Sequence, residues 1–380
     1  MPIEYAPAAP KYNAAMCETM NITPLEGYTA IEAERPSCNR EGGYPPPPHT
    51  DRLRRRRTNT SALLRQSLTR KRKENNMLLT SLLNALPGAV TQGLIWGLMA
   101  IGVYITYRIL DVADLTVDGS LALGGAACVM LIRGGVNPWL ALLIAALCGA
   151  AAGFITGTLH TRCGIPAILA GILTQLALYS VNLRIMGGKA NQAVSVDKYD
   201  LIVSQRFVRQ LSLENPMPLL LLVTALLIAA LYWFFGTEIG CGIRATGANA
   251  RMARAQGINT QRNVVVGLAL SNGIAALSGA LLCQYQGSAD VNMGRGAIVI
   301  GLAAVIIGES LLGKVFRNFG LRMLSVSLGA IVYYLVLQVV LQLGLNTNDL
   351  KLLSAAIVAV FLAIPHLKGK LTHKGGTVHA

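Results

Sequence analysis

The stretch 217–235, MPLLLLVTALLIAALYWFF, contains no charged residue. It has the length of about 20 residues that a helix needs to cross the hydrocarbon core of a membrane. Comparable apolar stretches recur along most of the chain and predict nine spans, at 85–107, 115–132, 138–159, 165–183, 217–235, 264–284, 297–312, 323–343 and 352–364. The sequence therefore predicts an all-α polytopic membrane protein with about nine transmembrane helices.

The composition agrees with this prediction. Hydrophobic residues make up 53% of the chain and charged residues 13%, whereas soluble domains carry about 25% charged residues. The net charge of +15 would suggest nucleic acid binding in a soluble protein. Here the basic residues cluster at 52–73 or lie in gaps between spans, which indicates membrane topology and no nucleic acid partner.

Seven cysteines are scattered along the chain, several of them inside apolar runs, and no C-x-x-C pair occurs. This pattern predicts neither a disulfide framework nor a metal site, and we expect no cofactor.

Two of the nine predicted spans are weaker than the others. The second and the seventh are short and interrupted by glycine and by an acid, Asp118 and Glu309 respectively. This pattern predicts broken helices inside the bundle. For Glu309 we expect a structural ion pair with Lys314 or Arg317.

The loops between spans predict the orientation. Basic residues are concentrated at 236–262, at 313–322 and in the tail 367–380. Since such loops stay in the cytoplasm, the three segments and the C-terminus should be cytoplasmic. With nine spans they do fall on the same side.

Residues 1–76 contain a proline tract, two basic clusters and no apolar period, so we expect a disordered extension before a transmembrane domain at 77–366. Nine spans would place this basic extension outside the cell, against the orientation rule. We therefore favour Met77 as the functional start. The alternative is one miscounted span and a cytoplasmic extension.

The longest gap between spans is 187–215. Within it, Val203, Phe207 and Leu211 share one helical face opposite Arg206 and Arg209. This favours a short interfacial helix, although chance periodicity in a solvated loop remains an alternative.

The segment 308–314 fits the spacing of a phosphate-binding loop. A functional loop of this kind follows a strand and continues with Ser or Thr, whereas here a span precedes it and Val315 follows. The chain therefore supplies no nucleotide site of its own.

The predicted cytoplasmic segment 242–258 contains a short capped helix. Asn249 can cap its start and Gly257 suits the left-handed residue after its last turn. Between them lie good helix formers with interleaved Arg251 and Arg254. So short a helix is marginal in water, which indicates that neighbours or a partner hold it.

This segment resembles part of the permease subunits of the branched-chain amino acid and ribose class of ABC importers. The resemblance continues through 263–284, 290–295 and 301–308. The stretch 114–120, Asp-Leu-Thr-Val-Asp-Gly-Ser, is similar to the Asp-Leu-Ser-Val-Gly-Ser stretch of the sugar permeases, with Asp118 as an insertion. Together with 121–125 it most resembles the tryptophan/tyrosine-type branch, which has a single permease. The resemblance covers about 82–364.

The resemblance implies roles for two groups of residues. The element 245–258 would be the coupling helix that docks on the ATPase subunit, with contacts from Asn249, Ala250, Arg251, Ala253, Arg254, Gly257 and Ile258. The element 114–120 would line the translocation path, through Asp114, Thr116, Asp118 and Ser120. Because of the inserted Asp118, sugar-specific contacts are not carried over. For Asp114, a helix cap at the membrane surface is an equal alternative.

The segment 113–119 also has a faint echo at 289–296, where Ala-Asp is again followed by a short polar stretch and a weak span. The two copies follow spans one and six. This odd offset predicts an inverted repeat, a common plan in transporters. Because the match is short, chance similarity is the alternative.

The function best supported by these features is the permease subunit of an ABC importer that moves a small solute, here an amino acid, by alternating access. It would need an ATPase subunit, an extracytoplasmic solute-binding protein, a second permease copy in a homodimer and a bacterial cytoplasmic membrane. An ion-coupled transporter or channel is the alternative, with three acids available for coupling. An intramembrane enzyme is disfavoured because the five histidines lie outside the spans or at their ends, and we expect no catalytic residues.

Overall fold

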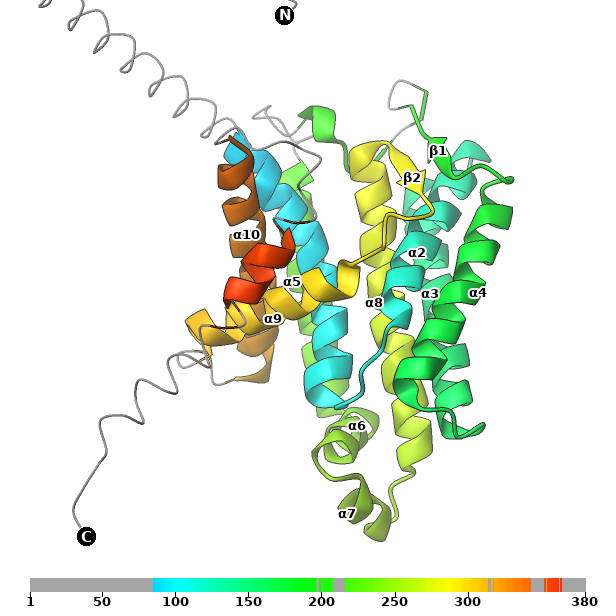
Figure 1. Cartoon of the computed structure of the whole chain (residues 1–380), viewed down its shortest axis with the longest axis vertical. Coiled ribbons are helices and arrows are strands. Elements are labelled where there is room, and N and C mark those ends of the chain that lie inside the picture. Colours follow the sequence, from blue (N-terminus) through cyan, green and yellow to red (C-terminus); the bar gives the residue numbers. More distant parts are fainter. Residues whose placement is uncertain are drawn as a thin grey trace, which may run out of the picture. The chain divides into compact units, whose positions relative to one another are not determined.

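The computed structural model describes residues 85–195, 198–199, 201–207, 216–313, 316, 318–342, 352, 354–361 and 363 (Figure 1). The chain separates into two units, 1–66 and 67–380, and all described residues belong to the second. The predicted extension 1–76 and the tail 367–380 lie outside the described residues.

The described chain is built almost entirely from helices. A first helix, Ala85–Ile109, ends in a π-helical turn, η2 (Ile105–Ile109). It is followed by α2 (Thr116–Arg133), α3 (Pro138–Thr161), α4 (Ala167–Ile185), β1 (Asn191–Ala193), η3 (Gln205–Phe207), α5 (Pro216–Gly236), α6 (Glu238–Ala248), α7 (Ala250–Ala255), α8 (Thr260–Gln286), β2 (Ser288–Asp290), α9 (Ala297–Leu312) and α10 (Phe319–Gln342). Residues 354–361 are helical as well. The all-α prediction is confirmed.

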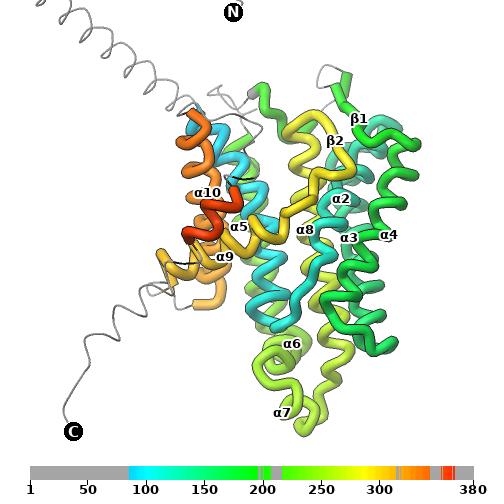
Figure 2. Tube along the Cα trace, viewed as in Figure 1, coloured from blue at the N-terminus to red at the C-terminus, as the bar shows by residue number. Residues whose placement is uncertain are grey.

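Eight of the nine predicted spans correspond to helices in the described part of the chain, and the described residues of the ninth are helical. The exact count of nine is not confirmed. Seven of the helices in the described part are long and apolar enough to cross a membrane. The seventh predicted span corresponds to α9, which has 16 residues and a length of about 24 Å at 1.5 Å per residue. The ninth lies partly outside the described residues. Figure 2 shows α9 running at a steep angle to the helices beside it.

The prediction of broken helices is wrong for α2 and α9, which are continuous. The break lies just before α2, where residues 110–115 connect it to η2. Asp118 does not interrupt α2, because it lies in the first turn, where a carboxylate is compatible with a helix. The predicted interior position of α2 is confirmed, since 78% of its span is buried.

Small residues allow the central helices to approach closely. Gly149, Gly153 and Gly157 recur every four residues on α3 and face α8. A Cβ atom on Gly153 would lie 2.3 Å from the Leu268 carbonyl oxygen, and one on Gly149 would lie 2.5 Å from the Asn272 carbonyl oxygen. Such close backbone contact is typical of helix pairs in membranes. It makes α3, α2 and α8 the densest part of the bundle.

The two ends of the bundle differ. α6 and α7 form one end, and the antiparallel pair β1–β2 lies at the other (Figure 1). Arg244 and Arg322 line one common pocket at the α6 end. The loops that contain these two arginines therefore lie on the same side, as the nine-span topology requires.

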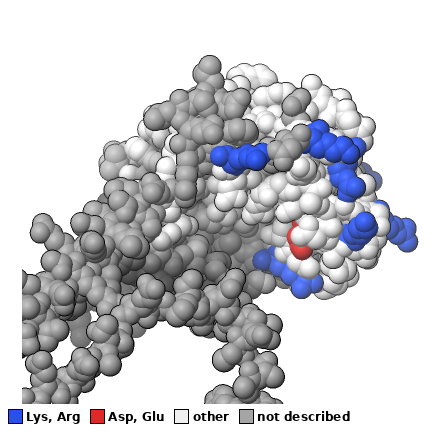
Figure 3. Space-filling model, turned by 90° about the horizontal axis from the view of Figure 1, so that it is seen from above, with Lys and Arg blue, Asp and Glu red and all other residues white. Residues whose placement is uncertain are grey.

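Basic side chains are not restricted to the α6 end. Figure 3 shows Lys and Arg side chains over the end that carries β1 and β2. The exposed basic residues of the segments at this end include Arg133, Arg184, Lys189 and Lys198. The charge difference between the two ends is therefore smaller than the three loops alone suggested.

The loop 187–215 differs from its prediction. Residues 205–207 form the short 3-10 turn η3, where the sequence predicted part of an interfacial α-helix. Val203 is buried and Arg206 is exposed. Residues 208–215, including Arg209 and Leu211, lie outside the described part of the chain.

Candidate functional site: a capped helix, a polar cluster and an aromatic cavity

The capped helix predicted in the 242–258 segment is present as α7. The Asn249 side chain accepts hydrogen bonds from the backbone N–H groups of Arg251 and Met252, both at 3.1 Å. At the other end Gly257 has a φ of +80°, and the Ile258 N–H donates to the Ala253 carbonyl at 3.0 Å. Both caps are those expected from the sequence.

The sequence did not reveal that α7 is preceded by a second helix, α6. The Thr237 hydroxyl caps α6 by accepting from the Gly240 N–H at 3.4 Å. Asn249 is extended, with φ −158° and ψ 97°, so the chain turns between the two helices. The predicted element therefore consists of the last turn of α6 and all of α7. Apolar residues at every third or fourth position of 238–248 were the available signal.

α7 presents a basic and apolar surface. Arg251 and Arg254 are exposed, and the Met252 side chain between them is 64% exposed. Ala253 is buried and holds the helix to the rest of the chain. α7 lies at the tip of the α6 end (Figure 1), so these side chains are available to a partner.

The 114–120 segment is the centre of a buried polar cluster. The Asp114 carboxylate accepts from the Thr116 N–H at 2.9 Å and from the Asn272 side-chain amide at 2.6 Å. The Asn272 side-chain oxygen accepts from the Ser120 hydroxyl at 2.7 Å. Burial raises the pKa of Asp114 above its ordinary value, while the hydrogen bonds from Thr116 and Asn272 act in the opposite direction.

A chain of hydroxyl groups extends this cluster to two further helices. The Thr116 hydroxyl lies 2.9 Å from that of Thr156 on α3, which donates to Thr174 on α4 at 2.9 Å. The sequence analysis missed Thr156, Thr174 and Asn272. Their polar side chains within apolar spans were the available signal.

Asp118, in contrast, joins α2 to α9. Its carboxylate accepts from the backbone N–H groups of Gly296 at 2.9 Å and Ile298 at 2.8 Å. Gly296 is the N-cap residue of α9 and Ile298 its second residue, and N–H groups at the start of a helix have no partner within that helix. Asp118 thus caps a helix that begins almost 180 residues later in the chain.

The two segments of the predicted repeat share a local geometry. The Asp114 carboxylate accepts from the N–H of Thr116, two residues on, and the Asp290 carboxylate accepts from that of Asn292 at 2.7 Å. The Asp114 turn leads directly into α2, which begins at Thr116, whereas residues 293–296 lie between the Asp290 turn and the start of α9 at Ala297. The inverted repeat stays a prediction.

Next to the start of α9 lies a cavity of about 490 Å³. It is lined from the first helix, α9, α10 and the helical residues 354–361, with Trp96, Tyr333 and Tyr334 in its wall and Arg295 and Gly296 at the α9 end. The Trp96 and Tyr334 ring centroids lie 5.8 Å apart.

The lining of this cavity combines apolar rings with a few polar groups. The buried Trp96 indole N–H has no hydrogen-bond acceptor among the described residues. Gln92 and Gln338 add side-chain amides to the wall. Small-molecule sites typically have this composition, yet the sequence analysis did not single out any of these residues.

Of the four predicted pathway residues, Asp118 is connected to this cavity through its bond to Gly296. Asp114, Thr116 and Ser120 lie instead in the polar cluster between α2, α3 and α8.

Glu309 forms an ion pair that the sequence analysis did not predict. Its carboxylate lies 3.2 Å from Nε of Arg108 in η2. The expected pair with Lys314 or Arg317 stays a prediction, because both residues are outside the described part of the chain. Within the described ranges, no group of three His, Cys, Asp or Glu side chains could hold a metal ion.

Comparisons with known proteins show the family to which this chain belongs. A family model described as branched-chain amino acid transport system / permease component matches residues 86–364. The tyrosine transport system permease protein of Clostridioides difficile (strain R20291) is 37% identical over 285 residues, 75% of this chain and 92% of that protein. The ribose import permease protein RbsC of Escherichia coli (strain K12) is 27% identical over 260 residues, 64% of this chain and 80% of that protein.

A solved structure of a metal-chelate type ABC transporter in an inward-facing conformation is similar with a TM-score of 0.40 and 15% identity. The alignment covers 75% of this chain and 85% of that one. The sequence matches confirm the resemblance seen in the motifs: this chain belongs to the family of branched-chain amino acid transport system permease components, and is an integral membrane protein of the ABC permease type.

Proposed function

We propose that this chain is the permease subunit of an ABC importer, driven by a separate ATPase subunit that docks on α7. The observation that carries the proposal is the short helix capped by Asn249 and Gly257, whose exposed face consists of Met252 and two arginines. A six-residue helix gains little stability from its own hydrogen bonds, so the caps at Asn249 and Gly257 are what keep it formed. A helix that is already formed can transmit a conformational change of the ATPase to the spans.

The other residues of the predicted coupling helix would have roles in the same docking element, which would face the cytoplasm together with the C-terminus. They form its exposed surface or pack it against the rest of the chain, and are Ala250, Arg251, Ala253, Arg254 and Ile258. A second copy of the chain and an extracytoplasmic solute-binding protein would complete the importer in the cytoplasmic membrane of a bacterium.

For the substrate we propose an amino acid with an aromatic side chain. The rings of Trp96, Tyr333 and Tyr334 form an apolar wall, and Arg295 offers a cation to a carboxylate at the same cavity. The 37% identical relative is a tyrosine transport system permease by name. Asp118 would act on this path by holding the start of α9, and Asp114, Thr116 and Ser120 by holding α2 against α8.

The test is ATP-dependent uptake in proteoliposomes that contain the chain and its ATPase subunit, with the solute-binding protein added on the side from which the solute is taken up. The paired change Arg251→Glu and Arg254→Glu should abolish copurification of the ATPase and reduce uptake of labelled tyrosine to background, because it reverses the charge of the docking face. The matched control is Lys189→Glu, which changes an exposed cation at the opposite end.

Uptake that persists after ATP depletion, or an ATPase that still copurifies with the paired variant, would overturn the proposal. Uptake that follows an imposed proton or sodium gradient instead would favour an ion-coupled transporter.

A further inference from the structure

A second cavity, of about 600 Å³, lies at the α6 end of the bundle. Three helical elements contribute to its wall: the end of the first helix, α6 and the first turn of α10. Each of them supplies an arginine, namely Arg108, Arg244 and Arg322. The sequence separates these residues widely, so only the packing of the three elements brings the cations together.

The positive charges of the three arginines are not neutralised to the same extent by neighbouring carboxylates. Arg108 forms an ion pair with Glu309, and the two side chains are 59% and 32% exposed. Within the described part of the chain, this is the only ion pair of a carboxylate with any of the three. Arg244 stacks over the Phe319 ring, with its guanidinium carbon 5.2 Å from the ring centroid, and keeps its charge unpaired there.

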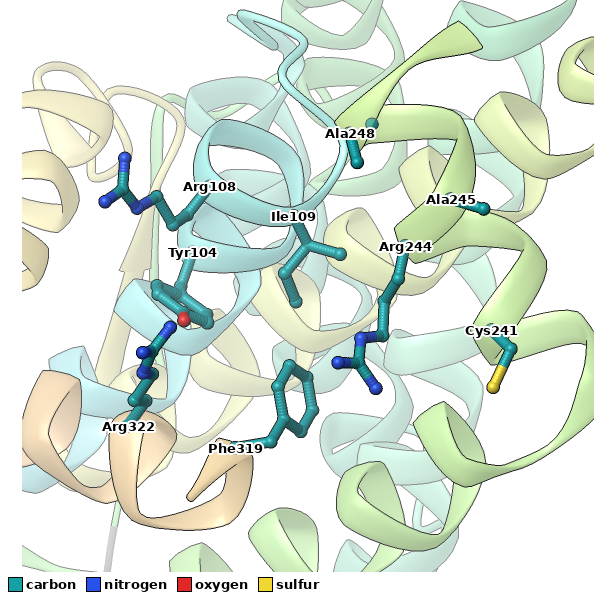
Figure 4. A pocket seen from close by; sticks show the side chains of 10 residues that line it. Tyr104, Arg108, Ile109, Cys241, Arg244, Ala245, Ala248, Phe319 and Arg322 are labelled. Atoms are coloured by element: carbon teal, nitrogen blue, oxygen red, sulfur yellow. The ribbon is translucent and has the colours of Figure 1, made fainter. Parts of the chain in front are cut away.

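The side chains are arranged around a shared opening. Figure 4 shows Arg244 and Arg322 on either side of Phe319, with the Arg322 guanidinium next to Tyr104. Arginine presents several N–H donors in a planar fork that suits phosphate oxygens. Two such groups at one opening favour an anion with several oxygen atoms.

The position of the cavity along the spans indicates where the anion comes from. Arg108 lies in the last turn of the first span and Arg322 in the first turn of α10. Next to Gly320 lies the ring of Tyr232, which is 60% exposed and precedes the 74% exposed Trp233. Exposed Trp and Tyr at a span end mark the level of the lipid headgroups.

Apolar surface also continues beside the cavity. Leu321 is 38% exposed and Leu311 is 58% exposed, at the adjoining ends of α10 and α9. An acyl chain could lie on this surface while its phosphate occupies the cavity. α7 contributes no residue to the lining, whereas Ala245, Gly247 and Ala248 in the last turn of α6 do. The cavity therefore adjoins the base of the docking element and does not include the exposed face of α7.

We propose that this cavity binds the phosphate group of an anionic phospholipid, with Arg244 and Arg322 as the main ligands and Arg108 as a third cation. The bound lipid would connect the first helix, α6 and α10 at the base of the docking element. The proposal rests on the membrane-spanning arrangement described above, and lipid binding does not require transport.

The test is native mass spectrometry of the full-length chain released from detergent with phosphatidylglycerol or with phosphatidylcholine. The wild-type chain should retain phosphatidylglycerol preferentially. An arginine in contact with an anionic headgroup should contribute about fivefold to the affinity, the equivalent of about 1 kcal/mol. The pair Arg244→Gln and Arg322→Gln should therefore weaken retention by roughly 25-fold.

Two matched pairs of substitutions separate the cavity from general charge effects. Arg162→Gln with Arg262→Gln removes two exposed cations from the same end but from a different cavity, and should leave retention unchanged. Arg244→Lys with Arg322→Lys keeps the charge and should retain most of the lipid. Lipid retention is compared only among variants whose thermal midpoint in detergent equals that of the wild type.

Several outcomes would overturn the proposal. Equal retention in wild type and in the Arg244→Gln and Arg322→Gln pair would do so, as would an equal loss in the Arg162→Gln and Arg262→Gln pair. Displacement of the lipid by inorganic phosphate at an equal concentration would identify a free anion as the ligand. Loss of ATPase copurification in a separate experiment on the Arg244→Gln and Arg322→Gln pair, with unchanged lipid retention, would identify a protein interface. Because the lipid assay uses the chain alone, a failure of the proposed transport function would not alter its result.

Discussion

The Asp118 carboxylate on α2 accepts a hydrogen bond of 2.9 Å from the backbone N–H of Gly296, the residue before α9. A second bond, from Ile298 at 2.8 Å, completes the cap. The two helices are far apart in the sequence, and α9 is too short to be positioned by span length alone. This capping bond therefore determines where α9 begins beside the aromatic cavity.

The first prediction concerns this cap. Asp118→Ala should destabilise the protein by about 1–2 kcal/mol, since loss of a capping acceptor costs roughly this amount. Thermal unfolding in detergent measures the change. Glu238→Ala, which removes an exposed acid from the first turn of α6, is the control and should cost only about 0.3–1 kcal/mol. Equal losses of stability in both variants would show that the bonds from Asp118 to α9 stabilise the protein no more than an exposed acid at a helix start does.

The second prediction concerns the contact between α3 and α8. Gly153→Val should destabilise the bundle by at least about 1–3 kcal/mol, the usual cost of overpacking, because the added carbon would meet the Leu268 carbonyl at 2.3 Å. The yield of monodisperse protein and its thermal midpoint measure the effect. Gly236→Ala is the control, since a Cβ atom there meets nothing within 4 Å. A stable Gly153→Val variant would contradict the close packing.

The third prediction is a pH dependence that arises from Asp114. Its native-state pKa is raised above the ordinary 3.8, mainly by burial, so the native state holds the proton more tightly than the unfolded state. The contribution of the bound proton to the free energy of unfolding is fully present below the ordinary pKa. It is lost as the pH rises through the raised native-state pKa.

Asp114→Asn should therefore flatten the pH dependence of the thermal midpoint over this window. Asp111→Asn changes an exposed acid of the same connection and should leave the dependence unchanged. The Asp114 interpretation fails if the wild type and Asp114→Asn give parallel curves.

The fourth prediction concerns the cavity beside α9. Trp96→Phe keeps an aromatic ring but removes the indole N–H that has no acceptor among the described residues. If the substrate supplies this acceptor, the KM for uptake should rise by up to about tenfold, the equivalent of one hydrogen bond of about 1.4 kcal/mol. The thermal midpoint should be unchanged or higher.

Trp139→Phe is the control for that experiment, because Trp139 is 55% exposed at the start of α3. It should leave KM unchanged. A wild-type KM in Trp96→Phe would exclude a substrate bond to the indole.

The sequence predicted the helices better than their contacts. Local signals were sufficient for the spans and for both caps of α7, since Asn249 and Gly257 act within a few residues of their own position. The short helix α6 was missed because its weak period lies directly after a long apolar run. The ion pair of Glu309 with Arg108 was not predicted, because the two residues are about 200 positions apart in the sequence.

The sequence by itself determined that this is a helical membrane protein, because a run of apolar residues of that length satisfies its backbone hydrogen bonds in lipid only as a helix. Only the tertiary structure decided how the polar groups are used. Asp114 meets Asn272 across 158 positions, and Asp118 meets Ile298 across 180. The physical reason is that these partners are chosen by helix packing, which depends on close glycine contacts between α2, α3 and α8 and has no signature in the local sequence around each acid.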